Sequence, residues 1–263
     1  GIAVAQSKDW YYRRSVSEFA KRAISVENAY LKRVQDELAY AIFNNANYSV
    51  KDMLVDNLTL NVKAFLNADS SVIPDAPNGT TFAGASHTHY KGYASGSLAV
   101  ADVDGIISNV TEHGNFGVKL FVPAALVATL EGLSGTKFVK VSMVGIINPN
   151  DVASTVSAVD MANSDPENRL AGYWEGVPVF TRSWVKTGMI VCVASNAMGQ
   201  MPLVFRQDPV AALRGLHIEA EQVSHPIMAT MWGANFGIAP WNRSAVAVLD
   251  SAHSSYTKPT LIR

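Results

Sequence analysis

The sequence has little charge, one cysteine and no long apolar run, and each shortage excludes a class of protein. Charged residues make up 16% of the 263 positions, below the usual quarter, so we expect other subunits to cover part of the surface. A net charge of −1 argues against an electrostatic grip on nucleic acid or on an anionic membrane. No apolar run reaches the roughly 18 residues that span a bilayer. The single cysteine, Cys192, lies in an apolar run, which predicts a core position.

The motifs of common enzyme classes are also missing. The stretch 132–137 has glycines and a lysine, but not at the spacing of a phosphate-binding loop, and neither a dinucleotide fingerprint nor a nucleophile elbow occurs. Asp102 and Asp104 are close neighbours, yet they lie at a predicted helix start, where carboxylates favour the positive end of the helix dipole. We therefore predict a capping role for both in preference to acid–base catalysis, and no catalytic centre and no cofactor.

A histidine pair offers the one candidate metal site. His87 and His89 are two residues apart and would project from the same face of a strand. A zinc site needs a third protein ligand, and the nearest histidine, His113, lies beyond an intervening predicted helix. The favoured interpretation is that local hydrogen bonds satisfy both imidazoles, and we predict no stoichiometric metal.

The hydrophobic pattern predicts three helices, of which the shortest covers 124–133, and a strand-rich C-terminal half. Apolar residues at helical spacing predict one long helix over 15–43, which the asparagine-rich stretch 44–47 ends, and a second helix over 102–113 that Gly114 ends. Further strands are predicted at 58–66, 118–122, 203–206, 216–222, 227–232 and 245–249. The clearest predicted hairpin joins 177–185 to 189–195 through Lys186-Thr187-Gly188.

Two segments are candidates for contacts between subunits. The polar stretch 148–172 is predicted to be a long surface loop, which in a compact chain is usually functional or partnered. Near the N-terminus, three aromatic residues adjoin two arginines, a composition typical of protein interfaces and, as an alternative, of base stacking on nucleic acid. The candidate contact residues are Trp10, Tyr11, Tyr12, Arg13, Arg14, Asp151, Asp160, Asp165 and Arg169.

This order of elements resembles the major capsid protein of tailed double-stranded-DNA bacteriophages, which has the Hong-Kong-97 fold, and in particular a subgroup from actinobacterial phages. The segments that carry the resemblance run from about Trp10 to Asp250. They are Glu37-Leu38-Ala39-Tyr40-Ala41-Ile42-Phe43-Asn44-Asn45, Phe65-Leu66-Asn67-Ala68-Asp69, Thr81-Phe82, Ser86-His87-Thr88-His89-Tyr90, Glu112-His113-Gly114, Gly176-Val177-Pro178-Val179 and the strand pair through Asn242-Arg243 into 245–249.

The resemblance implies an α+β fold with a peripheral and an axial domain. Residues 1–117 would hold the N-terminal segment, the spine helix 15–43 and the rest of the peripheral domain, to which about 227–242 return. Residues 118–226 would form the axial domain, to which about 243–252 return, and 253–263 would be a tail. The loop 148–172 would then lie near the centre of a capsomer. About 14 residues precede the spine, and the chain starts without methionine, so we expect a processed or longer protein.

The implied function is a structural shell protein of the virion, which is no enzyme. It would assemble as hexamers and pentamers into an icosahedral head around packaged double-stranded DNA, without sequence-specific DNA binding and away from any membrane. Assembly would take place in the host cytoplasm, with decoration, portal or scaffold proteins as further partners. The alternatives are a nanocompartment shell of the same fold and, from a different class, a metal-dependent hydrolase that uses His87, His89 and His113.

Overall fold

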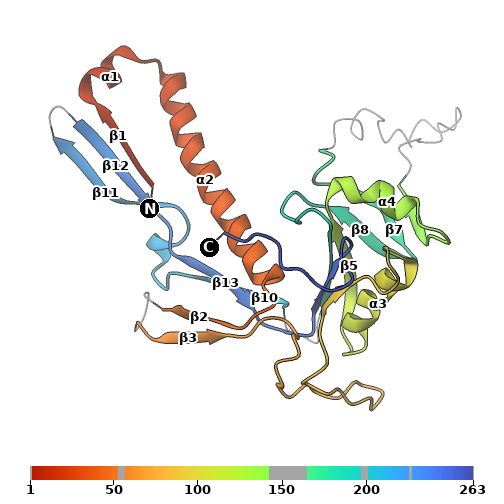
Figure 1. Ribbon diagram of the computed structural model, residues 1–263. Helices are drawn as coiled ribbons and strands as arrows, with labels where there is room; N and C mark the ends of the chain where they lie inside the picture. Colours follow the sequence, from red (N-terminus) through yellow and green to blue (C-terminus); the bar gives the residue numbers. More distant parts are fainter. Residues whose placement is uncertain (1, 53–56, 142–164, 197–200, 225–226, 263) are drawn as a thin grey trace, which may run out of the picture.

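The computed structural model describes residues 2–52, 57–141, 165–196, 201–224 and 227–262 (Figure 1). Its helices are α1 (Lys8–Arg13), α2 (Val16–Phe43), α3 (Val100–Thr111) and α4 (Val127–Glu131), with short 3-10 turns at Ala124–Leu126 and Ala211–Leu213. Its strands are β1 (Ile2–Ser7), β2 (Tyr48–Lys51), β3 (Thr59–Val62), β4 (Tyr90–Gly92), β5 (Phe116–Val122), β6 (Phe138–Lys140), β7 (Leu170–Trp174), β8 (Val177–Thr181), β9 (Met189–Asn196), β10 (Leu203–Gln207), β11 (His217–Ser224), β12 (Ile227–Gly233), β13 (Phe236–Pro240) and β14 (Val246–Asp250).

A mixed sheet of seven strands, in the order β4-β14-β9-β5-β8-β7-β6, forms the body of the molecule. Helix α3 packs on one face of this sheet, against β14, β9 and β5, while the C-terminal end of α2 packs near the other face. Strand β14 supplies both cores, because successive side chains of a strand point to opposite faces. Ala247 and Leu249 join the core under α3, and Val246 and Val248 join the core that contains Phe43.

The long helix predicted over 15–43 is confirmed as α2, with its N-cap at Ser15 and its C-cap at Asn44. At its start the Glu18 carboxylate accepts a hydrogen bond from the Ser15 backbone N–H, at 3.3 Å, as in a capping box. Its burial is uneven along its length. The last turn, through Phe43, is buried, whereas Leu31, which the helical pattern assigned to the apolar face, is 49% exposed.

The second predicted helix is confirmed as α3, and Asp102 acts at its start as expected. The Asp102 carboxylate accepts hydrogen bonds from the backbone N–H groups of Ala99, at 2.8 Å, and Ala94, at 2.9 Å. Asp104 has a different role from the predicted cap. Its carboxylate accepts the indole N–H of the fully buried Trp174, at 2.9 Å, and so fixes α3 to β7.

Three smaller sheets lie along α2, away from the body (Figure 1). β1, β12 and β11 form an antiparallel three-stranded sheet, which we call the ribbon, and it lies beside the N-terminal half of α2. β2 pairs with β3, and β10 pairs with β13. Strands β1 and β13 were not predicted from the sequence. In the described residues, no helix combines the length and the apolar character needed to cross a membrane.

The predicted hairpin of 177–185 and 189–195 is wrong. Both segments form strands, β8 and β9, but β5 lies between them, pairing parallel with β8 and antiparallel with β9. The stretch between the two strands is therefore a connection that spans a third strand. Local turn residues could not reveal this, because β5 comes from more than 50 residues earlier in the chain.

The strand pairing also groups the chain differently from the expected domains. Strands β10 and β11 were grouped with the axial segment 118–226, yet they pair with β13 and β12 along α2. Helix α3 and β4 were grouped with the peripheral segment 1–117, yet both belong to the seven-stranded body. The chain passes between the seven-stranded body and the small sheets along α2 more often than the sequence predicted, because long-range packing decides which strands pair.

Candidate functional site

The aromatic and arginine residues near the N-terminus lie on α1 and directly after it. Trp10 is half-buried, and the guanidinium of Arg22 on α2 stands over its ring, 4.5 Å from the centroid. The Tyr12 side chain is 78% exposed. Trp10 thus already packs within its own chain, while Tyr12 presents its ring to the outside.

The two arginines of this segment form ion pairs within the chain. Arg13 contacts Asp9 at 3.0 Å and Arg14 contacts Glu18 at 3.0 Å, both between residues four apart. Both pairs are largely exposed, and exposed pairs contribute little to stability. The arginines therefore lose little if a neighbouring carboxylate replaces these partners.

Two of the four candidate residues from the polar stretch lie in described parts of the chain, and Asp151 and Asp160 lie outside them. Asp165 closes a turn by accepting hydrogen bonds from the Glu167 backbone N–H, at 2.9 Å, and the Asn168 side chain, at 2.6 Å. The backbone N–H of Arg169 donates a hydrogen bond to the Thr181 hydroxyl, at 3.0 Å. Its Nε is buried without a hydrogen-bond partner among the described residues. The predicted loop ends before Gly172, which belongs to β7.

Neither hydrophobic core of the described residues includes a side chain of the ribbon. Every residue of β11 from 218 to 223 is exposed, so neither face of this strand is covered. Ile218 is 46% exposed and Val223 is 75% exposed, and on the adjoining strand β12 Ile227 and Met231 are 52% and 44% exposed. Ile218 and Val223 pair with Trp232 and Met228 and so point to one face of the ribbon, whereas Ile227 and Met231 point to the other. Exposed apolar side chains that gather on a surface are typical of interaction sites. The sequence pattern predicted these strands, but nothing in it indicated that both faces stay uncovered.

A hollow of about 870 Å³ lies between the two-stranded sheets and α2. An ion pair between Arg206 and Asp52 crosses from β10 to the end of β2. Phe205 and Trp241 line the hollow and are 47% and 62% exposed. This open surface combines aromatic with charged side chains, at the end of α2 opposite to the ribbon.

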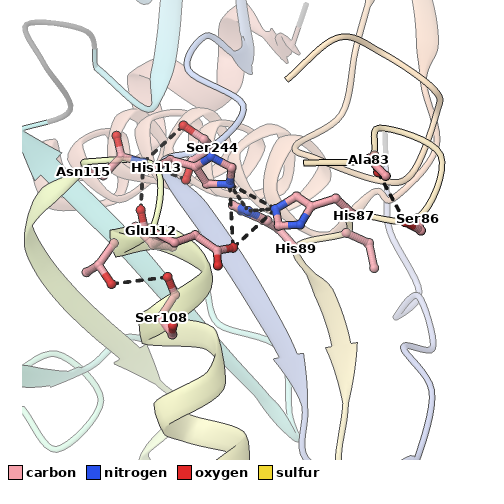
Figure 2. A network of polar contacts seen from close by, with 12 residues as sticks. Ala83, Ser86, His87, His89, Ser108, Glu112, His113, Asn115 and Ser244 are labelled. Atoms are coloured by element: carbon pink, nitrogen blue, oxygen red, sulfur yellow. Dashed lines mark hydrogen bonds and ion pairs between the residues drawn. The ribbon is translucent and has the colours of Figure 1, made fainter. Parts of the chain in front are cut away.

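The histidines form a compact cluster, contrary to the interpretation that the sequence favoured. Figure 2 shows the imidazoles of His87, His89 and His113 turned toward one another, with the Glu112 carboxylate beside them. The Nε2 atoms are 3.3 Å apart for His87 and His89, 3.0 Å for His87 and His113, and 3.2 Å for His89 and His113. Glu112 Oε1 lies 3.5 Å from His87 Nε2 and 3.9 Å from His113 Nε2. Four potential metal-ligating atoms therefore lie within 4.8 Å of one another.

The argument that the histidine pair lacks a third ligand is wrong. Helix α3 runs back along the sheet, so that its C-terminal end, with Glu112 and His113, meets the segment before β4. His89 is fully buried, and its Nδ1 contacts the Val246 carbonyl on β14 at 2.8 Å, a long-range partner and not the local one expected. The intervening helix brings the third histidine to the pair instead of separating them.

Burial favours the uncharged form of all three histidines. It lowers the pKa of His89 to about 3, and burial together with the neighbouring His87 lowers the pKa of His113 to about 4. Burial, with help from the Lys91 charge, lowers the pKa of His87 as well, and burial raises the pKa of Glu112. At neutral pH the three imidazoles are neutral and carry lone pairs, since each holds a pKa below its ordinary value.

Cys192 occupies the core position that the sequence predicted. It is fully buried on β9, and burial raises the pKa of its thiol far above the ordinary value. A buried neutral thiol is unreactive, because the thiolate is the nucleophile. Its role is that of a small core residue.

The comparison with solved structures identifies the fold. A chain of Mycobacterium phage Patience aligns with a TM-score of 0.74 at 17% identity, over 98% of this chain and 71% of that one. A capsid chain of cyanophage A-1(L) aligns with a TM-score of 0.50 at 9% identity, over 95% and 76%. A capsid chain of an empty GTA particle also reaches 0.50, at 11% identity, over 96% and 71%. No family model and no curated protein sequence matches the chain.

The alignments extend over nearly the whole of this chain. The expected α+β class is confirmed by the helices and strands described above. The resemblance read from the sequence is confirmed at the level of the fold: this chain has the Hong-Kong-97 fold of phage capsid proteins.

Proposed function

We propose that the chain is a major capsid protein, which assembles with copies of itself as hexamers and pentamers into an icosahedral phage head around double-stranded DNA. The observation that carries this proposal is the capsid fold combined with a ribbon whose edge strand, β11, is exposed on both faces from 218 to 223. A strand with two uncovered faces is marginal in water, since it lacks a packed side. A neighbouring subunit would cover it and bury its apolar side chains.

The remaining contacts of the proposed shell come from the segments that the sequence singled out. We assign Tyr12, Trp10 and the adjoining Arg13 and Arg14 to a contact between subunits, because aromatic residues and arginine are enriched in interfaces. The loop 148–172, with Asp151, Asp160, Asp165 and Arg169, would lie near the centre of a capsomer. Truncation of Trp10 to alanine would then cost about 2 kcal/mol or more per interface.

The DNA in this proposal is confined and not tightly bound. Neutralising phosphates needs many lysine and arginine side chains, and a chain with net charge −1 has no such excess. Isolated subunits should therefore bind DNA weakly at physiological salt. Decoration, portal or scaffold proteins complete the proposed virion, and assembly would take place in the host cytoplasm.

Electron microscopy of particles purified after expression of the chain tests the proposal. We expect closed shells, and in infected cells shells filled with DNA. A smaller shell filled with protein would indicate the nanocompartment alternative instead. A soluble species of one or two subunits with hydrolase activity would reject both shell functions.

A second experiment distinguishes folding from assembly by comparing the melting temperature of the subunit with the yield of closed capsomers, which are separated from subunits by mass. Deletion of residues 150–160 within the polar stretch should leave the melting temperature of the subunit unchanged and reduce the yield of closed capsomers. Wild-type shell yield from this variant would contradict the placement of the loop at a capsomer axis.

A further inference from the structure

The histidine cluster has the arrangement of a metal site, and the distances among its nitrogens support this directly. Ligand atoms held about 2.0–2.1 Å from a tetrahedral Zn²⁺ ion lie about 3.3–3.4 Å from one another. The three Nε2–Nε2 distances are 3.0, 3.2 and 3.3 Å. Glu112 Oε1, at 3.5 Å from His87 Nε2, stands near the fourth corner. The three nitrogens thus lie at close to ligand spacing, and the Glu112 oxygen, 3.9 Å from His113 Nε2, is somewhat farther out.

Hydrogen bonding among the rings cannot account for this arrangement. A carbonyl oxygen accepts and never donates, so His89 Nδ1 must carry the proton that bonds to Val246, and its Nε2 is left with a lone pair. If both His87 and His113 carried a proton on Nε2, two donors would face each other at 3.0 Å. If one of them lacked that proton, two lone pairs would face each other. No assignment of protons makes all three contacts favourable in the neutral cluster.

The surroundings of the cluster point to a cation as well. Glu112 Oε1 is buried and has no hydrogen-bond partner among the described residues. A buried carboxylate oxygen without a hydrogen-bond partner is costly, and the lone pair of His89 Nε2 offers it no proton. His89 donates its other ring nitrogen to a backbone carbonyl, the outer contact that orients metal-ligating histidines in general. Phe82 packs against the rings of His87 and His113, with centroids 4.8 and 4.3 Å away.

We propose that His87, His89, His113 and Glu112 bind one divalent transition-metal ion, for which Zn²⁺ is the best match, in a structural site. Three imidazoles and one carboxylate suit zinc better than magnesium or calcium, which prefer all-oxygen ligands. Four protein ligands close the coordination sphere, as in structural sites, whereas a catalytic zinc keeps one position open. The ion would tie the segment before β4 to the end of α3 and, through His89 and Val246, to β14.

Zinc content of the purified chain tests the site. After incubation with Zn²⁺ and exhaustive dialysis, elemental analysis should find about one ion per chain. His113→Gln should lose this ion, while the matched control His217→Gln should retain it, since His217 lies on β11 and contacts only the Gly215 carbonyl in the described structure. Loss of zinc in both variants, retention in both, or far less than one ion in the wild type would overturn the proposal.

A titration of the unmodified protein avoids any folding defect of the variants. Chelator-stripped wild-type chain should take Zn²⁺ from a chromophoric indicator with an endpoint at one equivalent, and its melting temperature should rise until that endpoint. Co²⁺ in place of Zn²⁺ should give the intense visible bands of four-coordinate cobalt. A featureless titration, or weak six-coordinate cobalt bands, would show that the cluster does not close around a metal. Neither result bears on shell formation, so the two proposals fail independently.

Discussion

Strands β14 and β11 lie at opposite extremes of burial in the same chain. All five residues of β14 are buried, whereas the residues of β11 from 218 to 223 are all exposed. Both strands have apolar residues, and both pair with neighbours over nearly their full length. The difference lies in what covers their faces: α3 and the end of α2 cover β14, and nothing in the described chain covers the faces of β11.

This contrast separates the parts of the molecule that stabilise the subunit from those available for its neighbours. Hydrophobic stabilisation follows the apolar area removed from water, so β14 contributes it when the chain folds. The apolar residues of β11 could contribute it only when another molecule removes them from water. The same amino-acid types thus serve folding in the body and, in our proposal, assembly in the ribbon.

The largest expected effect comes from a matched pair of truncations in the two strands. Leu249→Ala on β14 removes a fully buried side chain and should lower the free energy of unfolding by about 2–5 kcal/mol. Ile218→Ala on β11 should change it by less than about 0.5 kcal/mol, because the side chain is 46% exposed. Chemical denaturation of unassembled subunits measures both values. Equal losses would show that the ribbon is packed within its own subunit.

The next effect concerns assembly, in which substitutions in the ribbon should have the larger consequence. Val223→Ser with Ile227→Ser removes two exposed apolar side chains at the tip of the ribbon and should leave the subunit folded. If a neighbour buries them, shell yield in sedimentation should fall at least about tenfold, since each 1.4 kcal/mol of lost contact is a factor of ten. Val72→Ser, at a residue that is 97% exposed outside the ribbon, is the control. An unchanged yield for the double variant would remove the ribbon from the interface.

A smaller effect is expected at the start of α3. Asp102→Ala leaves the backbone N–H groups of Ala94 and Ala99 without their acceptor and should cost about 1–2 kcal/mol. Asp102→Asn keeps one oxygen acceptor and should cost less. Thermal melting of both variants measures the order. A loss for Asn that matches the loss for Ala would mean that charge at the helix start, and not hydrogen bonding, is the main contribution.

The smallest effect depends on pH and concerns Asp69, in the loop between β3 and β4. Burial alone would raise the pKa of Asp69, but hydrogen bonds from Asn47 and Ser71 and the charge of Arg243 outweigh it and hold the pKa well below its usual value. A depressed pKa adds stability above the unfolded value of about 3.9, and this stability is lost as pH falls below it.

The destabilisation caused by Asp69→Asn should therefore be larger at pH 7 than near pH 3. Urea denaturation of the variant and of the wild type at both pH values measures this difference. Asp75→Asn, at an exposed residue of the same loop, is the matched control. A gap between wild type and Asp69→Asn that widens on acidification would contradict the sign.

The sequence predicted those features that depend on neighbours along the chain. The helical spacing and the capping residues Ser15 and Glu18 located α2 to within a residue at each end, because these signals act over three or four positions. Cys192 was placed in the core from its apolar surroundings. The capsid fold was recognised from short segments in a fixed order, and a TM-score of 0.74 confirms it.

Features that depend on distant partners were missed. The insertion of β5 between β8 and β9 cannot be read from a turn sequence, because hydrogen bonds to a third strand decide it. The histidine cluster was dismissed since 24 residues separate His89 from His113, although a helix that returns along a sheet can close that distance. The sequence did place two further potential ligands, Glu112 and His113, at the end of a predicted helix. Only the topology of the fold brings that helix end to His87 and His89.

The place of β14 next to the edge strand β4 also constrains the order of events during synthesis. This strand, at residues 246–250, lies between β4, from residue 90, and β9, from residue 189, so the sheet has a gap until β14 leaves the ribosome. At about 5–20 residues per second, chaperones have on the order of ten seconds to meet an unfinished sheet after β4 emerges. The subunit body is therefore completed last at the edge that carries β4.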